Sequence, residues 1–238
     1  MMVSGWEGDR VTTRLQLAPS ILTADFGRLA DEIKSVEGYV DWFHLDVMDG
    51  HYVENLTFGP STVEAIARVT DTPLHVHLMI TDPARYASGF ASAGARRISF
   101  HPEVTEDVGE TIEKVASTGV GVGLAIHPDV PVETARAHLD DVQVVLMMTV
   151  RPGFGGQKFL DDVVPKIHQA ALMLQESGKT AEVDIEVDGG VNESTLDRAV
   201  AAGGQILVAG SAIFDGVDAP AAASRLRGRL DVLGKGMP

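Results

Sequence analysis

The stretch Asp184-Ile185-Glu186-Val187-Asp188 alternates acidic and β-branched apolar side chains. Side chains alternate faces along a β-strand, so the three acids share one face and the two apolar residues take the other. The apolar face suits packing against helices. If the strand belongs to a closed barrel with helices outside, the acidic face points toward the barrel axis. This stretch therefore predicts a strand, and within a barrel it would place polar groups in the interior.

Two earlier stretches, residues 42–46 and 74–79, show the same alternation. Their shared inward faces are formed by Trp42, His44, Asp46, His75, His77 and Met79. Burying an unpaired charged group costs several kcal/mol, so such residues need partners or a metal ion. We therefore expect the inward-facing acids and histidines to carry out a function together.

The whole chain of 238 residues alternates β-rich runs with helical segments rich in Ala, Glu, Leu and Arg. The expected strands are Leu15–Ser20, Trp42–Asp46, Leu74–Met79, Arg97–His101, Gly121–Ile126, Val142–Met148, Asp184–Asp188 and Gln205–Ala209. The expected helices include Phe26–Val36, Pro83–Ala93, Asp107–Thr118, Asp161–Glu176 and Thr195–Ala202. Eight such units predict a single (β/α)8 TIM barrel, since open doubly wound sheets usually have fewer strands. We place the barrel at residues 14–238 and an N-terminal tail at residues 1–13.

The composition narrows the class of function. With 19 Lys and Arg against 34 Asp and Glu, the chain carries a formal charge of −15. Such a chain repels a phosphate backbone and offers no basic membrane-binding face, so we expect neither a nucleic-acid nor a membrane partner. The absence of cysteine excludes disulfides, thiolate catalysis and Cys-ligated zinc. No apolar run approaches a membrane span or a signal peptide, so we expect a cytoplasmic protein.

Four inward-facing residues at three strand ends form a candidate metal site: His44, Asp46, His77 and Asp188. Imidazole nitrogen and carboxylate oxygen are suitable ligands for Zn²⁺, Fe²⁺ or Mn²⁺. The alternative is that each histidine is a satisfied core residue and each aspartate caps a strand end. We interpret His75 and His101 as supporting or structural residues. The remaining candidates, His51, His138 and His168, are expected on the surface or in loops.

Three glycine-bearing turns follow the last expected strands, and they predict a phosphate site. They comprise Arg151–Gly156, Asp188–Gly190 and Gly210–Ser211. Glycine lets backbone amides approach an anion, and phosphate sites recur at this place in TIM barrels. The alternative is that these are only tight turns. Three methionines at strand ends, Met48, Met79 and Met148, could form an apolar wall over the site or simply fill the core.

Six stretches, in order along the chain, resemble the ribulose-phosphate 3-epimerase family. They are Leu17–Phe26, His44–Gly50, His77–Ile80, Pro152–Gln157, Val187–Gly190 and Val208–Phe214. The resemblance runs from about residue 15 to residue 230. It implies interconversion of D-ribulose 5-phosphate and D-xylulose 5-phosphate through an enediolate, with the ketose phosphate as small-molecule partner. We also expect the chain to form a homo-oligomer.

The resemblance also assigns roles to individual residues. It implies one divalent metal ion, usually zinc with Fe²⁺, Mn²⁺ or Co²⁺ as alternatives, held by His44, Asp46, His77 and Asp188. It makes Asp46 and Asp188 the acid/base pair acting from opposite faces of the substrate. The residues implied to contact substrate are Ser20, His77, Gly153, Phe154, Gly155, Gly156, Gly189, Gly190, Gly210, Ser211, Met48, Met79 and Met148.

Five positions depart from the family pattern: Glu54, His75, His127, Val130 and Arg151 stand where Pro, Asp, Asn, Thr and Asn are usual. None of them is a proposed metal or acid/base residue, but they bear on the identity of the sugar. One alternative is therefore a 3-epimerase of a related ketose phosphate such as allulose 6-phosphate. That family tends to carry Ala and Ser at the positions of Gly155 and Gly190. The other alternative is a catalytically silent sugar-phosphate-binding protein.

Overall fold

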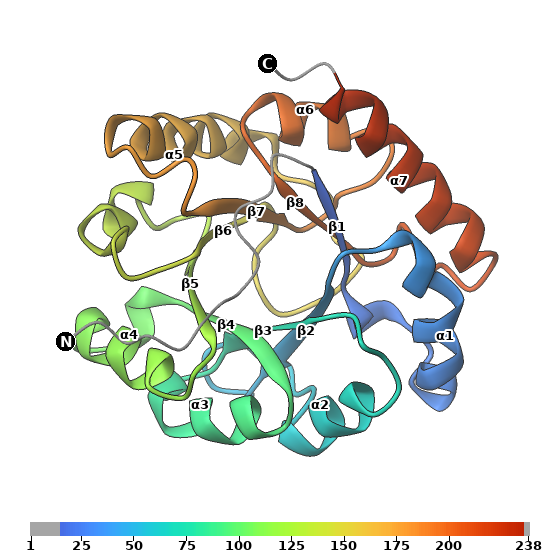
Figure 1. Ribbon diagram of the computed structural model, residues 1–238, viewed down its shortest axis with the longest axis horizontal. Coiled ribbons are helices and arrows are strands. Elements are labelled where there is room, and N and C mark those ends of the chain that lie inside the picture. The colour runs from blue at the N-terminus through green and yellow to red at the C-terminus, as the bar shows by residue number, and fades with distance from the viewer. Residues whose placement is uncertain (1–14, 236–238) are drawn as a thin grey trace.

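The computed structural model describes residues 15–235, in which eight parallel strands form a barrel surrounded by helices (Figure 1). The strands are β1 Gln16–Pro19, β2 Phe43–Met48, β3 Leu74–Met79, β4 Ala95–Phe100, β5 Gly121–Ile126, β6 Val144–Met148, β7 Asp184–Asp188 and β8 Ile206–Ala209. From β2 to β8 each strand pairs with the next strand along the chain, and β8 pairs with β1. An isolated parallel bridge between Ser20 and His44 joins β1 to β2. The predicted TIM barrel is confirmed. The predicted tail at residues 1–13 lies outside the described residues.

The expected strands agree with the observed ones to within two residues at each end. β2 extends two residues beyond its expected end at Asp46. It continues to Met48 because Val47 and Met48 still pair with Leu78 and Met79 of β3. In β4 the strand ends at Phe100, one residue before His101. Pro102 follows and begins a short 3-10 helix, so the chain turns there.

The helices form the outer ring. They are α1 Leu29–Val36, α2 Pro60–Ala67, α3 Pro83–Ser92, α4 Val108–Ala116, α5 Val164–Glu176, α6 Leu196–Ala201 and α7 Ala219–Gly234. The helices expected at 26–36 and 161–176 each begin with a separate 3-10 turn. The connection after β5 contains only a 3-10 helix, Val132–His138. None of the helices within residues 15–235 has the length and apolar character needed to span a bilayer.

The core has two layers, as the alternation in the strands predicts. Phe43, Leu45, Ile185 and Val187 belong to the large apolar layer between the strands and the helices. A second, smaller apolar cluster lies on the barrel axis and consists of Ala18, Trp42, Ala125, Val144, Leu146, Met148, Val150, Ile206 and Val208. The rest of the axis is polar, because β2, β3 and β7 contribute buried histidines and acids there.

At the amino-terminal end of the strands, the polar part of the axis is closed by a buried arginine. The guanidinium of Arg97 stacks over Trp42 at 4.4 Å from the ring centroid, and it lies 3.9 Å from the carboxylate of Asp184. Burial raises the pKa of Asp184 to about 6, and Arg97 opposes that rise. The amino-terminal end of the barrel is therefore closed by a structural contact. In TIM barrels the active site lies at the opposite, carboxyl end of the strands.

Candidate metal and active site

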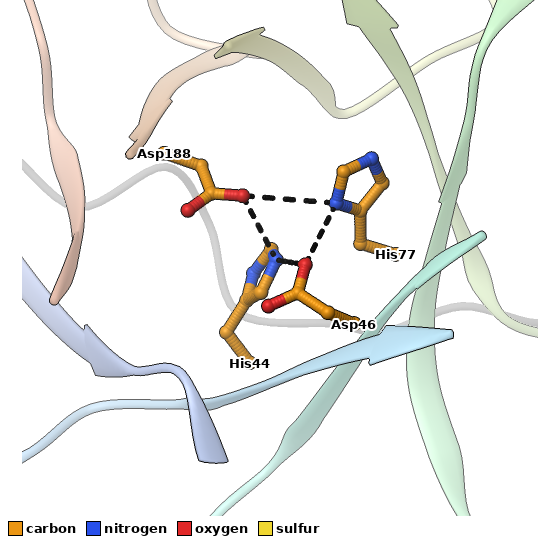
Figure 2. A group of neighbouring side chains, drawn as sticks. All are labelled: His44, Asp46, His77 and Asp188. Atoms are coloured by element: carbon orange, nitrogen blue, oxygen red, sulfur yellow. Dashed lines mark hydrogen bonds and ion pairs between the residues drawn. The ribbon is translucent and has the colours of Figure 1, made fainter. Parts of the chain in front are cut away.

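Four side chains from β2, β3 and β7 point toward one another at the carboxyl end of the barrel (Figure 2). Asp46 Oδ1 lies 3.2 Å from His44 Nε2 and 3.1 Å from His77 Nδ1. Asp188 Oδ2 lies 3.5 Å and 3.7 Å from the same two nitrogens. All four residues are buried. The structure thus brings together the four residues predicted as metal ligands.

The charges in this cluster favour a bound cation. Burial and the nearby negative charge of Asp46 raise the pKa of Asp188 above its usual range. Burial alone would also raise the pKa of Asp46, but the charge of His44 and hydrogen bonds with His44 and His77 lower it instead. Although burial opposes it, Asp46 and Asp188 raise the pKa of His44 well above its usual value. Two buried carboxylates therefore attract positive charge at this point, and two nitrogens and two oxygens suit a divalent transition metal.

A pocket opens directly above the cluster. Its lining includes Asp46, Asp188 and the residues predicted to contact substrate, with the exception of His77: Ser20, Met48, Met79, Met148, Gly153, Phe154, Gly155, Gly156, Gly189, Gly190, Gly210 and Ser211. The hydroxyl of Ser20 donates to Asp46 Oδ2 at 2.6 Å. Asp46 therefore uses one oxygen toward the two histidines and the other toward the pocket wall.

Several glycines on the pocket rim stand where a side chain would be strained or would overlap a neighbour. Gly189 and Gly190 have φ values of +122° and +65°, and a Cβ at Gly190 would overlap the backbone of Phe159. A Cβ at Gly155 would lie 2.5 Å from Thr23 Cγ2. These turns are therefore tight, and they also line the pocket.

The strand-end methionines divide between the pocket and the outer layer of the core. Met48, Met79 and Met148 are buried and line the pocket, and Met148 also belongs to the axial cluster. Met147 points the other way, into the layer between strands and helices. Three flexible thioethers therefore cover one side of the pocket with apolar surface.

Thr23 is a pocket residue that was not among those expected to contact substrate. Its hydroxyl oxygen is buried without a hydrogen-bond partner in the described structure, and its side chain lines the pocket near Gly155 and Gly210. An unpaired buried hydroxyl is costly, so Thr23 is suited to contact a ligand. Its position three residues after Ser20, in the first loop, was the available signal.

His44 is held from behind by a carboxylate. Its Nδ1 lies 2.8 Å from Glu186 Oε1. Glu186 is in turn contacted by His75, whose Nε2 lies 2.7 Å from Ser99 Oγ. Burial lowers the pKa of His75 to about 4, against the pull of Glu186. All four side chains are fully buried or nearly so.

His77 is held from behind by a second histidine. Its Nε2 lies 3.0 Å from His101 Nε2, and His101 Nδ1 lies 3.4 Å from Glu103 Oε1. The hydroxyl of Tyr52 donates to the same Glu103 oxygen at 2.8 Å. Burial lowers the pKa of His101 to about 4, so it is neutral and can accept the hydrogen bond from His77. This row of residues leads outward from the cluster.

Four of the five departures from the family pattern lie together. A hollow beside the pocket above the metal cluster is lined by Glu54, His127, Val130 and Arg151. Arg151 makes a two-point ion pair with Asp129 at 2.6 and 3.2 Å. The fifth departure, His75, lies in the barrel interior. None of these five residues lines the pocket above the metal cluster.

The fold and the buried site define a TIM-barrel protein with a candidate metal centre at the carboxyl ends of its strands. Residues 16–214 match the model of the ribulose-phosphate 3 epimerase family. The chain belongs to this family. A ribulose-phosphate 3-epimerase of Bacillus subtilis (strain 168) is 49% identical over 90% of this chain and 99% of its own length. One from Escherichia coli (strain K12) is 40% identical over 90% and 95%.

A solved structure shows how widely the fold is shared. The chain matches KGPDC from Streptococcus mutans with a TM-score of 0.70, over 92% of this chain and 99% of that one. The two sequences are only 16% identical, so this likeness concerns the fold alone.

Proposed function

We propose that this protein interconverts D-ribulose 5-phosphate and D-xylulose 5-phosphate by moving a proton at C3. The observation that carries the proposal is the convergence of Asp46 on β2 and Asp188 on β7 at the floor of one pocket. Membership of the epimerase family supports it. An epimerase needs two acid/base groups, because the proton leaves one face of the carbon and returns to the other.

The four clustered residues would hold one divalent metal, through His44 Nε2, His77 Nδ1, Asp46 Oδ1 and Asp188 Oδ2. We propose Zn²⁺, with Fe²⁺, Mn²⁺ and Co²⁺ as alternatives, because the donor set is two imidazoles and two carboxylates. Such an ion would act as a Lewis acid that stabilises negative charge developing on the sugar oxygens. Elemental analysis of the purified protein should find about one such ion per chain.

The two aspartates would carry the proton. One carboxylate accepts the proton from C3, which leaves an enediolate across C2 and C3. The other, in its acid form, delivers a proton to the opposite face of C3. The hydroxyl of Ser20 holds Asp46 Oδ2 at 2.6 Å and so fixes the orientation of this carboxylate. In the reverse reaction the two residues exchange roles.

The remaining pocket residues would bind and shield the sugar. The backbone amides of Gly153–Gly156, Gly189–Gly190 and Gly210–Ser211 would hold the phosphate, and Thr23 offers an additional hydroxyl close to them. The wall formed by Met48, Met79 and Met148 would keep water from the enediolate.

A panel of ketose phosphates tests this proposal against its alternatives. We expect a higher kcat/KM for ribulose 5-phosphate than for allulose 6-phosphate, because the chain has Gly155 and Gly190 where the allulose 6-phosphate family tends to carry Ala and Ser. The opposite preference would favour the six-carbon epimerase. No turnover of either sugar would favour a silent binding protein. A homo-oligomeric state and a cytoplasmic location stay predictions.

Solvent labelling tests the chemistry. In D₂O we expect deuterium at C3 of the product and none at C1, because the incoming proton comes from a different carboxylate than the outgoing one. Product that keeps its original C3 hydrogen would exclude the enediolate route. Label at C1 as well would indicate an aldose–ketose isomerase.

A further inference from the structure

We propose that His75 is a positioning residue for the metal site. It donates from Nδ1 to Glu186 and thereby orients the carboxylate that keeps His44 in the tautomer able to bind a metal. This inference rests on the metal site proposed above and extends it to a residue that departs from the family pattern. His75 itself contacts neither the metal ligands' binding atoms nor the substrate pocket.

The geometry of His44 sets the requirement. Its Nε2 faces the two aspartates, at 3.2 and 3.5 Å, so this nitrogen must be unprotonated to bind a metal. The ring proton must then be on Nδ1, which lies 2.8 Å from Glu186 Oε1. A carboxylate behind a ligand histidine fixes its tautomer and ring orientation and increases its basicity.

Glu186 would not hold this position unaided. It is fully buried, so its carboxylate needs nearby hydrogen-bond donors. His44 supplies one donor to Oε1. The Nδ1 of His75 supplies a second donor to the same oxygen, at 3.1 Å. This nitrogen also lies 2.8 Å from Oε2, which has no hydrogen-bond partner among the described residues.

Ser99 and Gly123 fix the tautomer of His75 in turn. His75 Nε2 lies 2.7 Å from Ser99 Oγ, whose hydroxyl can donate to it and leave the ring proton on Nδ1. Ser99 pairs with Gly123 of β5, and a Cβ at that glycine would overlap the Ser99 hydroxyl. The space for this hydrogen bond therefore exists only because residue 123 has no side chain.

The test compares two nearly isosteric variants, His75→Leu and His75→Asn. The Asn amide nitrogen falls near the position of His Nδ1 and can donate to Glu186, whereas Leu cannot. We expect the metal dissociation constant, measured by chelator competition, to rise about tenfold or more for His75→Leu. For His75→Asn it should stay within about threefold of wild type.

A third variant separates positioning from general destabilisation. Val144→Ala removes buried axial side chain with no hydrogen bond, so it should lower Tm and leave the metal dissociation constant unchanged. Unchanged metal affinity in His75→Leu would overturn the proposal. So would an equal loss of affinity in His75→Asn and His75→Leu, or in Val144→Ala.

A measurement on the wild-type protein covers the case in which His75→Leu does not fold. Nitrogen-15 NMR of the zinc-loaded protein should find the ring protons of His44 and His75 on Nδ1. A proton on Nε2 of His75 would overturn the proposal while leaving the metal site intact. If wild-type protein bound no divalent metal, the proposed metal site itself would fail, and this inference would fail with it.

Discussion

His44 and His77, the two candidate histidine ligands, each have a carboxylate and a second histidine behind them, but in opposite order. Behind His44 a carboxylate comes first and a histidine second, and the row ends in the fully buried barrel interior. Behind His77 a histidine comes first and a carboxylate second. That second row ends at Tyr52, which lines the hollow at the surface.

This difference suggests a division of roles. A carboxylate in direct contact raises the basicity of its histidine, while a neutral imidazole only accepts a hydrogen bond and fixes the tautomer. The row behind His44 is also screened from solvent, so its electrostatic interactions are stronger. We therefore expect metal binding to depend more on the support of His44 than on that of His77.

The largest effect should come from Asp46 and Asp188, the two aspartates that lie between His44 and His77. Asp46→Asn and Asp188→Asn should each lower kcat by about 10²- to 10⁴-fold, because Asn cannot accept a proton at neutral pH. Metal content must be measured on the same samples, so that lost metal is distinguished from lost proton transfer. A near-normal rate in either metal-loaded variant would contradict the two-carboxylate mechanism.

The next largest effect compares Glu186, the carboxylate behind His44, with Glu103, the carboxylate behind His77. Glu186→Gln should weaken metal binding by about 10- to 100-fold, because Glu186 contacts His44 directly. Glu103→Gln should weaken it by less than about tenfold, because His101 stands between Glu103 and His77. Chelator competition measures both. Equal losses would show that the two supports are equivalent.

A smaller effect is expected at His101. His101→Met removes the acceptor for His77 Nε2–H, and we expect a loss of metal affinity of up to about tenfold. His101→Gln should restore affinity, because its amide oxygen can accept the same hydrogen bond. If the two supports differ as proposed, the metal affinities of His101→Met and His101→Gln should differ by less than those of His75→Leu and His75→Asn. The idea of a tautomer support fails at His77 if the Gln variant is no better than the Met variant.

The smallest effect should be that of Tyr52→Phe, at the outer end of the row behind His77. It removes one hydrogen bond to Glu103, worth about 0.5–1.5 kcal/mol of folding stability at most. We expect metal affinity within about threefold of wild type. A large loss would mean that the outer row controls the site as strongly as the buried one, which would remove the distinction between them.

The sequence by itself determined the barrel and which side chains face its axis. Alternation in 42–46, 74–79 and 184–188 has a period of two, and the pleat of a strand allows no other assignment of faces. That was enough to bring His44, Asp46, His77 and Asp188 to one end of the barrel. The helices α2 and α7 were not among those expected, and the strand ends were placed only to within two residues.

Only the tertiary structure decided which of these groups touch and through which atoms. Glu186 and His44 are 142 residues apart, and His75 reaches Ser99 only where Gly123 leaves space. The choice of Nε2 on His44 and Nδ1 on His77 also depends on what lies behind each ring. The physical reason is that the period of a strand gives direction, whereas a hydrogen bond requires a distance, which strand register, barrel closure and side-chain packing set together.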